Sequence, residues 1–275
     1  MAKRLLTGII LLAVLIPVLI FGDTAALPTL FAVISVVSLY ETAKCAGDDK
    51  GKNLKIMIPV YIIAAVFPFF EFFTENKAVS ILMAAGALAA FAVFFYHVVK
   101  FGKAAPISQN ALILLMLIYV VGASSSAVSV AVEENGVFLV PLIIICSWGT
   151  DIFAYVFGSL FGRHKLSPVV SPKKSIEGSV GGTVMAAALT VAYGAIVSHF
   201  TSLSANYAAL FVTGILISVI SQMGDLNASA IKRSHNVKDF GKIFPGHGGM
   251  LDRFDSVIAA CPALYIISLL FTYFS

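Results

Sequence analysis

Residues 229–255 read SAIKRSHNVKDFGKIFPGHGGMLDRFD, and this charged stretch lies between two strongly apolar segments. Only 12% of the chain is charged, so the concentration of lysine, arginine and aspartate stands out. Because charges near hydrocarbon are costly, a dense cluster of both signs beside a membrane segment indicates a functional site. A solvated loop with snorkelling lysines would explain the basic residues, but it does not explain the aspartates, His247 and the glycines. The stretch therefore predicts a polyanion and metal site at a membrane surface.

The rest of the chain predicts a polytopic membrane protein. Hydrophobic residues make up 59% of the 275 positions, and they fall in runs of about 18 to 25, the length that a helix needs to cross a bilayer. The two basic residues before the first run could open a secretory signal, but the later runs favour an uncleaved first helix. We expect an all-α fold of about nine transmembrane helices, over residues 5–22, 26–45, 55–73, 78–99, 109–132, 137–161, 177–198, 203–231 and 250–274.

The lysines and arginines predict how these helices are oriented. Nine spans place the N-terminus and the loops at 46–54, 100–108, 162–176 and 232–249 on one side. Every basic residue except Lys77 then falls on that side or at the helix ends beside it. By the positive-inside rule that side is the cytoplasm, so we expect a cytoplasmic N-terminus and an outside C-terminus in the plasma membrane.

The chain is predicted to form a single membrane domain with two unlike halves. Residues 1–135 are mostly aliphatic with short loops, and we interpret them as scaffold helices. Residues 136–275 carry polar motifs inside apolar segments, and we predict that they form the catalytic half. Isolated cysteines in or beside apolar helices predict neither a disulfide framework nor a thiolate metal site, and this applies to Cys45, Cys146 and Cys261.

Three aspartates are the candidate metal ligands. Asp225 lies seven residues before Lys232, about 10 Å inside the end of its helix, where an unpaired carboxylate is costly. Pairing of Asp225 with a lysine is the structural alternative. Asp252 and Asp255 share a helix face, although two acids in a first turn also suit the helix dipole. Three carboxylates beside basic residues suit a hard divalent cation, Mg²⁺ first.

Two further segments are candidate phosphate sites. The glycines within residues 246–249 would let backbone amides approach an anion, although a tight turn also needs glycine. Lys173 and Lys174 precede a helix that Ser175 is predicted to cap, near a positive helix N-terminus where phosphates bind. A pair of lysines also suits a simple membrane anchor.

Two acids lie within apolar segments away from the charged stretch. Asp151 is about three helical turns from Arg163, and we expect it to hold a metal, pair with a lysine or line a polar cavity. Glu41 is interpreted as the interfacial i, i+3 partner of Lys44.

The charged stretch also resembles the signature of CDP-diacylglycerol synthases, also called phosphatidate cytidylyltransferases. The matching positions are Ser229-x-Ile231-Lys232-Arg233, Lys238-Asp239-x-Gly241 and Phe244-Pro245-x-His247-Gly248-Gly249-Met250-x-Asp252-Arg253-Phe254-Asp255. The resemblance extends upstream through Gly224-Asp225, SPKKSIEGSVGG at 171–182 and Asp151-x-x-Ala154-Tyr155. The chain departs from the family pattern at Ile176, where an aromatic residue is common, and at Ala228, where many members carry an acid. A catalytic role for that family acid is therefore in doubt here.

The resemblance implies a Mg²⁺-dependent reaction of CTP with phosphatidate, giving CDP-diacylglycerol and pyrophosphate. One or two divalent cations would serve, and a monovalent cation is compatible with the site. The resemblance implies catalytic roles for Asp225, Asp252, Asp255, Lys232, Arg233 and His247. Asp225 and Asp252 would be metal ligands, Asp255 a further ligand or a residue that orients the ligands, and His247 a positioning group. It implies substrate-binding roles for Asp151, Lys173, Lys174, Ser175, Glu177, Lys238, Asp239, Gly248, Gly249 and Arg253.

The expected partners are CTP, phosphatidate in the inner leaflet and membrane lipid, and no nucleic acid. Small residues within 178–182 would permit close helix packing within one chain or in a homodimer. The nearest alternative is a cytidylyltransferase that acts on another membrane-bound phosphate. An ion-coupled transporter is less favoured, because its site belongs near the midplane whereas these charges gather on one side. A membrane anchor would not need the acids.

Overall fold

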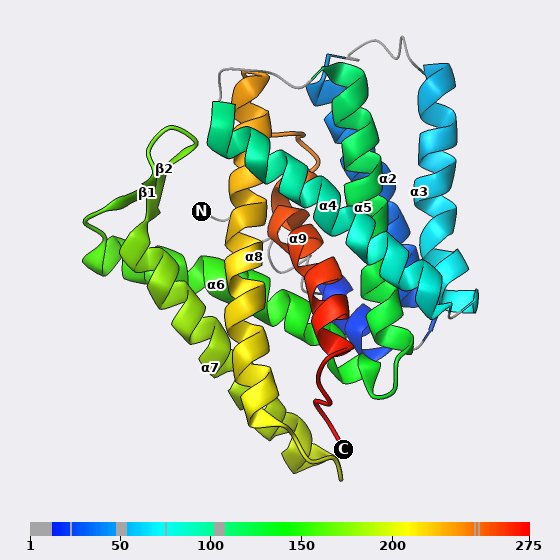
Figure 1. Cartoon of the computed structure of the whole chain (residues 1–275), viewed down its shortest axis with the longest axis vertical. Coiled ribbons are helices and arrows are strands. Elements are labelled where there is room, and N and C mark those ends of the chain that lie inside the picture. Colours follow the sequence, from blue (N-terminus) through cyan, green and yellow to red (C-terminus); the bar gives the residue numbers. More distant parts are fainter. Residues whose placement is uncertain are drawn as a thin grey trace.

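The computed structural model describes residues 13–22, 24–47, 54–74, 76–101, 108–244, 246 and 248–275, and these form a bundle of helices (Figure 1). Residues 13–20 are helical. The elements that follow are α2 (Ala26–Cys45), α3 (Leu54–Thr74), α4 (Lys77–Phe101), α5 (Gln109–Val132), the 3-10 helix η1 (Gly136–Phe138), α6 (Val140–Phe161), β1 (Lys165–Ser167), β2 (Ser171–Ser175), α7 (Ile176–Phe200), α8 (Tyr207–Ser234) and α9 (Leu251–Ser268).

Seven of the described helices, α2 to α8, are long and apolar enough to cross a membrane. This confirms an all-α polytopic membrane protein, and the predicted spans agree with the ends of these helices within a few residues. The predicted first span at 5–22 lies partly outside the described residues. The total of nine transmembrane helices therefore stays a prediction.

The ninth predicted span is too long at its C-terminal end, because α9 ends at Ser268 and not near residue 274. Ser204 and Ser275 exchange two backbone hydrogen bonds, and the Tyr273 carbonyl accepts a third from Asn206 N at 2.8 Å. Tyr273 and Phe274 are buried by this docking. Apolar composition alone does not distinguish a docked tail from a last helical turn, which explains the error.

The described residues also include one feature that the sequence did not predict, a short antiparallel hairpin of β1 and β2 between α6 and α7. The sequence predicts only a loop at 162–176. Each strand is only three to five residues long, too short for a recognisable alternation of polar and apolar residues. The hairpin places Lys174 close to the helices of the catalytic half.

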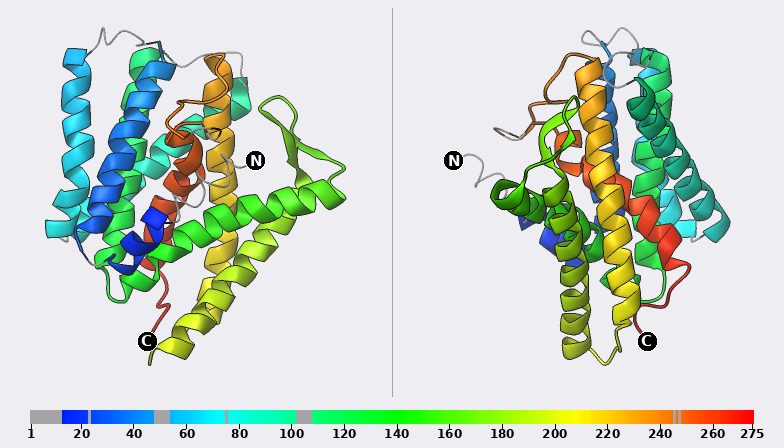
Figure 2. Two further views of the ribbon diagram at one scale, coloured as in Figure 1. Left: turned by 180° about the vertical axis from the view of Figure 1, so that it is seen from behind. Right: turned by 60° about the vertical axis from the view of Figure 1, so that its left-hand side comes forward.

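Helices α6 and α7 pack closely through glycine. A Cβ atom on Gly178 would lie 2.5 Å from the Ala154 carbonyl oxygen, and one on Gly182 would lie 2.7 Å from the Thr150 carbonyl oxygen. The small residues at 178–182 therefore serve contacts within this chain. Helix α6 is strongly inclined to α8, as both Figure 1 and Figure 2 show.

The two ends of the bundle differ in character. The hairpin and the loop that follows α8 lie at the same end, the upper one in Figure 1. The last turn of α3, the first turn of α4 and the C-terminal tail lie toward the lower end. Of the basic side chains near helix ends in the described part, Lys77 is at the lower end, where α4 begins.

Candidate active site

Three carboxylates from three helices meet beside one lysine. Asp151 lies on α6, Asp225 on α8 and Asp255 on α9, and we call them the acidic cluster. They are close enough that Asp151 and Asp225 both repel the charge of Asp255. Lys174, on β2, forms an ion pair with Asp225. The structure therefore brings these four predicted residues together, and the pairing of Asp225 with a lysine that we weighed as an alternative is observed.

Small hydroxyl groups connect the acidic cluster. Ser256 Oγ donates to Asp151 Oδ2 at 3.2 Å and contacts Asp255 Oδ1 at 3.3 Å. The Ser256 backbone N–H donates to the same Asp255 oxygen at 2.8 Å. Ser229 Oγ approaches Asp225 Oδ1 at 3.5 Å. Helix α9 thus positions Asp255 directly and orients Asp151 through Ser256.

A cavity of about 250 Å³ adjoins the acidic cluster. It lies between α6, the hairpin, α7 and α8, and Gln222 closes one wall through a hydrogen bond from Ser179 Oγ at 2.5 Å. Its lining includes four residues predicted from sequence, Asp151, Lys173, Lys174 and Ser175. Cations and acids therefore face the same space, as recognition of a phosphate and a metal ion requires.

Lys174 stays charged in this setting. Burial of the amine disfavours its charged form, but attraction to the Asp225 and Asp151 carboxylates outweighs burial and raises the pKa of Lys174 above its ordinary value. The amine is thus a permanent positive charge at the cavity wall through the physiological pH range.

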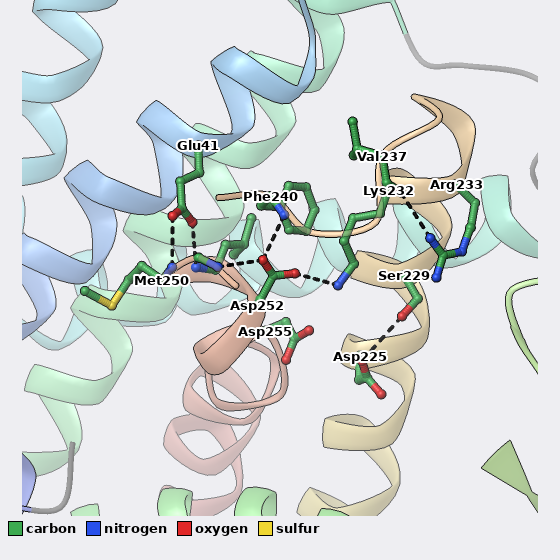
Figure 3. A network of polar contacts seen from close by, with 12 residues as sticks. Glu41, Asp225, Ser229, Lys232, Arg233, Val237, Phe240, Met250, Asp252 and Asp255 are labelled. Carbon is green, nitrogen blue, oxygen red and sulfur yellow. Dashed lines mark hydrogen bonds and ion pairs between the residues drawn. The ribbon is translucent and has the colours of Figure 1, made fainter. Parts of the chain in front are cut away.

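Asp252 organises the loop that joins α8 to α9 (Figure 3). Its Oδ1 accepts from Lys232 Nζ at 2.7 Å, and both residues are buried. Its Oδ2 accepts from the backbone N–H groups of Phe240 and Gly249, at 2.8 and 2.9 Å. Both carboxylate oxygens are therefore engaged in holding the loop, so the role of Asp252 as a metal ligand stays a prediction.

Glu41 is a structural residue that the sequence interpretation missed. It lies on α2 at 2% exposure, and its two oxygens accept from the backbone N–H groups of Met250 and Leu251 at 3.0 and 2.9 Å. Glu41 thus holds the N-terminal end of α9 and does not serve as a simple interfacial partner of Lys44. The available signal was a carboxylate within an apolar helix, which indicates a specific role.

The loop accommodates Glu41 because it carries glycines at the points of closest approach. A Cβ atom on Gly241 would lie 2.1 Å from Glu41 Oε1, and one on Gly249 would lie 2.2 Å from the same oxygen. Gly248 adopts a positive φ of 89°, which side chains other than glycine rarely tolerate. Gly248 and Gly249, predicted to bind substrate, therefore also have a conformational reason to be glycine.

Ser175 caps α7 as predicted, since its side chain accepts from Gly178 N at 3.2 Å. Glu177 instead contacts the start of the hairpin. Its carboxylate accepts from the Arg163 and His164 backbone N–H groups at 3.1 and 3.2 Å, and it lies 2.6 Å from His164 Nδ1. Glu177 therefore braces the hairpin, and its predicted contact with substrate stays a prediction.

The remaining basic residues are dispersed around the loop after α8. Arg233 Nη1 donates to the Val237 carbonyl at 3.1 Å. The Nε of Arg253 is buried and has no hydrogen-bond partner among the residues described. A second cavity, of about 630 Å³, is lined in part by Lys44, Lys238, Asp239 and Lys242. His247 lies outside the described residues.

The described side chains do not form a preassembled metal cage, because no group of three His, Cys, Asp or Glu residues among them is arranged to hold an ion. Asp225, Asp252 and Asp255 nevertheless lie in one region (Figure 3). What the arrangement offers is paired acids and amines around a cavity, suited to binding phosphates together with cations.

Comparison with known proteins agrees with this chemistry. The sequence model of the cytidylyltransferase family matches residues 2–271. A phosphatidate cytidylyltransferase of Staphylococcus haemolyticus is 32% identical over 272 residues, covering 97% of this chain and 98% of the relative. A protein of the same name from Bacillus subtilis is 30% identical over 282 residues, covering 99% of each chain. One from Staphylococcus epidermidis is 41% identical over 135 residues, about half of each chain.

Proposed function

The chain belongs to the cytidylyltransferase family, and from this premise we propose that it is a phosphatidate cytidylyltransferase of phospholipid biosynthesis. It transfers the cytidylyl group of CTP to phosphatidate and releases pyrophosphate. The observation that carries the proposal is the meeting of Lys174 with the acidic cluster at a cavity that Lys173, Lys174 and Asp151 line. Full-length similarity to phosphatidate cytidylyltransferases supports the choice of substrates.

In the reaction, an oxygen of the phosphatidate phosphate forms a bond to the α-phosphorus of CTP. The bond between that phosphorus and the oxygen bridging to the β-phosphorus breaks, and pyrophosphate leaves with the electron pair. The attacking phosphate is already anionic, so no strong general base is required. The barrier is chiefly one of positioning and charge neutralisation.

The chain's own residues supply both the positioning and the charge neutralisation. Lys173 and Lys174 stand at the cavity beside the N-terminus of α7, where a phosphate gains from the helix dipole as well as from the amines. Lys232, on the last turns of α8, is fixed by its ion pair with Asp252 of α9. Arg253, whose buried Nε has no partner in the described structure, is available for a charge-assisted contact to phosphate.

A magnesium ion would fit one or two carboxylates of the acidic cluster. Within the described part of the chain, Asp225 is the member of this cluster that forms an ion pair, whereas Asp151 and Asp255 do not. Mg²⁺ is usually held by one or two carboxylates together with substrate phosphates. We assign Asp225 and Asp255 as its ligands, with Asp151 beside them. When bound, the ion would neutralise charge on the reacting and leaving phosphates.

The topology supports a cytoplasmic active site in the plasma membrane. The hairpin and the loop after α8 lie at one end of the bundle (Figure 1), and most basic residues of the described part lie in these segments or at helix ends on that side. The positive-inside rule assigns this end to the cytoplasm, where CTP is available. The acyl chains of phosphatidate would stay in the bilayer while its head group enters the cavity.

The test is turnover by the purified protein in mixed micelles with CTP and phosphatidate. We expect CDP-diacylglycerol and pyrophosphate in equal amounts with Mg²⁺, and none after chelation. Asp225→Asn should reduce the rate about 100-fold or more, the size typical for loss of a charge-stabilising group. Its folding can be checked by an unchanged elution volume. Equal rates with a different membrane-bound phosphate would contradict the substrate, and full activity of the variant would contradict the metal assignment.

A further inference from the structure

One wall of the cavity beside the acidic cluster joins polar groups to a surface that faces lipid. On α6 this wall is formed by Asp151, Ala154 and Tyr155. Asp151 and Tyr155 are four residues apart, so they share a face of the helix. Both belong to the motif Asp151-x-x-Ala154-Tyr155. The proposed reaction uses Asp151 but assigns no role to Tyr155.

The mouth of this cavity lies beside Tyr155 and Lys173. These two are the exposed residues of the lining, whereas its other described members are buried or half-buried. Lys173 is on β2 of the hairpin, and Tyr155 is on the membrane-spanning helix α6. The mouth therefore has a cation on one side and an aromatic ring on the other.

Tyr155 lies on a face of α6 that meets lipid. Its side chain is 78% exposed, and the neighbouring Ile152 and Val156 are 60% and 39% exposed. Apolar side chains that are exposed on a membrane-spanning helix contact the bilayer. Tyr155 is six residues before Phe161, where α6 ends, which is about 9 Å by helical rise. This is the depth at which tyrosine meets the membrane–water interface.

The ligand that matches this mouth carries phosphate and hydrocarbon in one molecule. The cavity, of about 250 Å³, is smaller than the roughly 300–1,000 Å³ of sites for drug-sized ligands, so it accommodates a head group but not two acyl chains. A free nucleotide has no apolar part to place against the lipid-facing surface of α6. A lipid phosphate places its charge near Lys173 and Lys174 and leaves its chains in the bilayer beside Tyr155.

We propose that Tyr155 is a substrate-binding residue that recognises phosphatidate at this mouth. Its ring packs against the first carbons of the acyl chains, and its hydroxyl donates to an oxygen of the glycerol backbone. The hydroxyl is available for this contact, because it has no hydrogen-bond partner among the described residues. The inference rests on the proposed function, since it takes phosphatidate as the lipid substrate.

Steady-state kinetics of the purified full-length chain in mixed micelles tests this assignment. Tyr155→Leu should raise the mole fraction of phosphatidate needed for half-maximal rate by about tenfold, as loss of a well-placed contact residue does. The KM for CTP and the Tm should stay unchanged, because an exposed side chain contributes little to packing. Tyr155→Phe keeps the ring and loses one hydrogen bond, so its shift should be smaller, about threefold.

Two variants with matched changes serve as controls. Phe161→Leu removes an aromatic ring that is 59% exposed at the end of the same helix, and Tyr207→Leu makes the same substitution at the first residue of α8. Neither residue lines the cavity. Both variants should keep the phosphatidate dependence of the unmodified chain. If Phe161→Leu shifts that dependence as much as Tyr155→Leu does, the aromatic residues only anchor α6 at the interface and the proposal is wrong.

Photochemical cross-linking measures the contact without turnover. p-Benzoylphenylalanine is introduced at position 155, or at position 161 as the control, and the chain is reconstituted in phosphatidylcholine vesicles. The vesicles contain a small fraction of radiolabelled phosphatidate or, in a parallel sample, of radiolabelled phosphatidylcholine. Position 155 should cross-link phosphatidate several times more strongly, and excess unlabelled phosphatidate should compete. Position 161 should not distinguish the two lipids.

The outcomes separate this proposal from the proposed function. A chain that makes no CDP-diacylglycerol but cross-links phosphatidate selectively at position 155 would refute the reaction and support the lipid contact. Turnover whose phosphatidate dependence is unchanged in Tyr155→Leu would overturn the proposal and keep the reaction. The proposal is also wrong if Tyr155→Leu raises the KM for CTP to the same extent, or if position 155 cross-links both lipids equally.

Discussion

Asp252 and Asp255 are three residues apart on one helix, yet their surroundings differ. Asp252 accepts three hydrogen bonds that hold Lys232 and the loop, whereas Asp255 faces Asp151 and Asp225. The spacing predicted only that the two carboxylates share a helix face. The two carboxylates should therefore respond differently when each is made neutral.

We predict that Asp252→Asn lowers stability and activity together, whereas Asp255→Asn lowers activity alone. Removing one partner of a buried ion pair costs about 3–5 kcal/mol, which corresponds to a fall in Tm of roughly 6 °C or more. Asp255→Asn removes a carboxylate that lies near like charges, so its Tm should be unchanged or higher. Turnover and Tm of both purified variants decide the matter. If Asp252→Asn lost activity without losing stability, the result would favour Asp252 as a metal ligand over its structural role.

Glu41 provides a second test at the residue scale. Glu41→Gln removes a charged acceptor from two backbone N–H groups at the start of α9, and hydrogen bonds to charged groups contribute about 1.5–3 kcal/mol each. We expect a fall in Tm of roughly 4 °C or more and weaker CTP binding, because the loop beside Asp252 loosens. Glu134→Gln, at an exposed position, is the control and should leave both unchanged. Equal Tm values for the two variants would refute the role given to Glu41.

At the scale of elements, the contact between α6 and α7 requires glycine, whereas the position of Gly86 in α4 does not. A Cβ atom on Gly178 would meet the Ala154 carbonyl at 2.5 Å, whereas one on Gly86 of α4 would find its nearest neighbour at an ordinary 3.5 Å. Gly178→Ala should destabilise the chain by about 1–3 kcal/mol through overpacking. Gly86→Ala should stabilise it by up to about 1 kcal/mol through helix propensity. Thermal unfolding of the two variants measures the change in stability of each. A Gly178→Ala variant with unchanged stability would contradict the close contact.

Element positions were largely predictable from sequence, and contacts between elements were not. Runs of apolar residues determine where membrane helices lie, so α2 to α8 were located within a few residues. The hairpin is too short to show a period, and the docked tail after Ser268 is as apolar as a helix. Glu41 acts on Met250 and Leu251, which are about 210 positions away, and no local pattern reports such a contact. The acids and lysines of the site could be identified from their residue type and their position within apolar segments. The hydrogen bonds of Asp252 to the loop could not, because they form only when the loop is folded.

At the scale of the whole molecule, sidedness connects the fold to the function. The acidic cluster lies toward the end of the bundle that bears the hairpin and the loop after α8. We propose that this end is cytoplasmic, so that cytosolic CTP reaches the acidic cluster.

Single reporter cysteines test this orientation. Cys146 and Cys261 are buried and Cys45 is partly exposed, so the reporters belong in a background with Cys45→Ala. Lys173→Cys and Lys238→Cys are exposed sites on the hairpin and the loop after α8, and Glu134→Cys is an exposed site at the opposite end. In intact cells an impermeant maleimide should label Glu134→Cys alone, and permeabilisation should add the other two. The positive-inside rule requires this result because the basic residues concentrate at one end. Labelling of Lys173→Cys in intact cells would reverse the orientation and remove the acidic cluster from its supply of CTP.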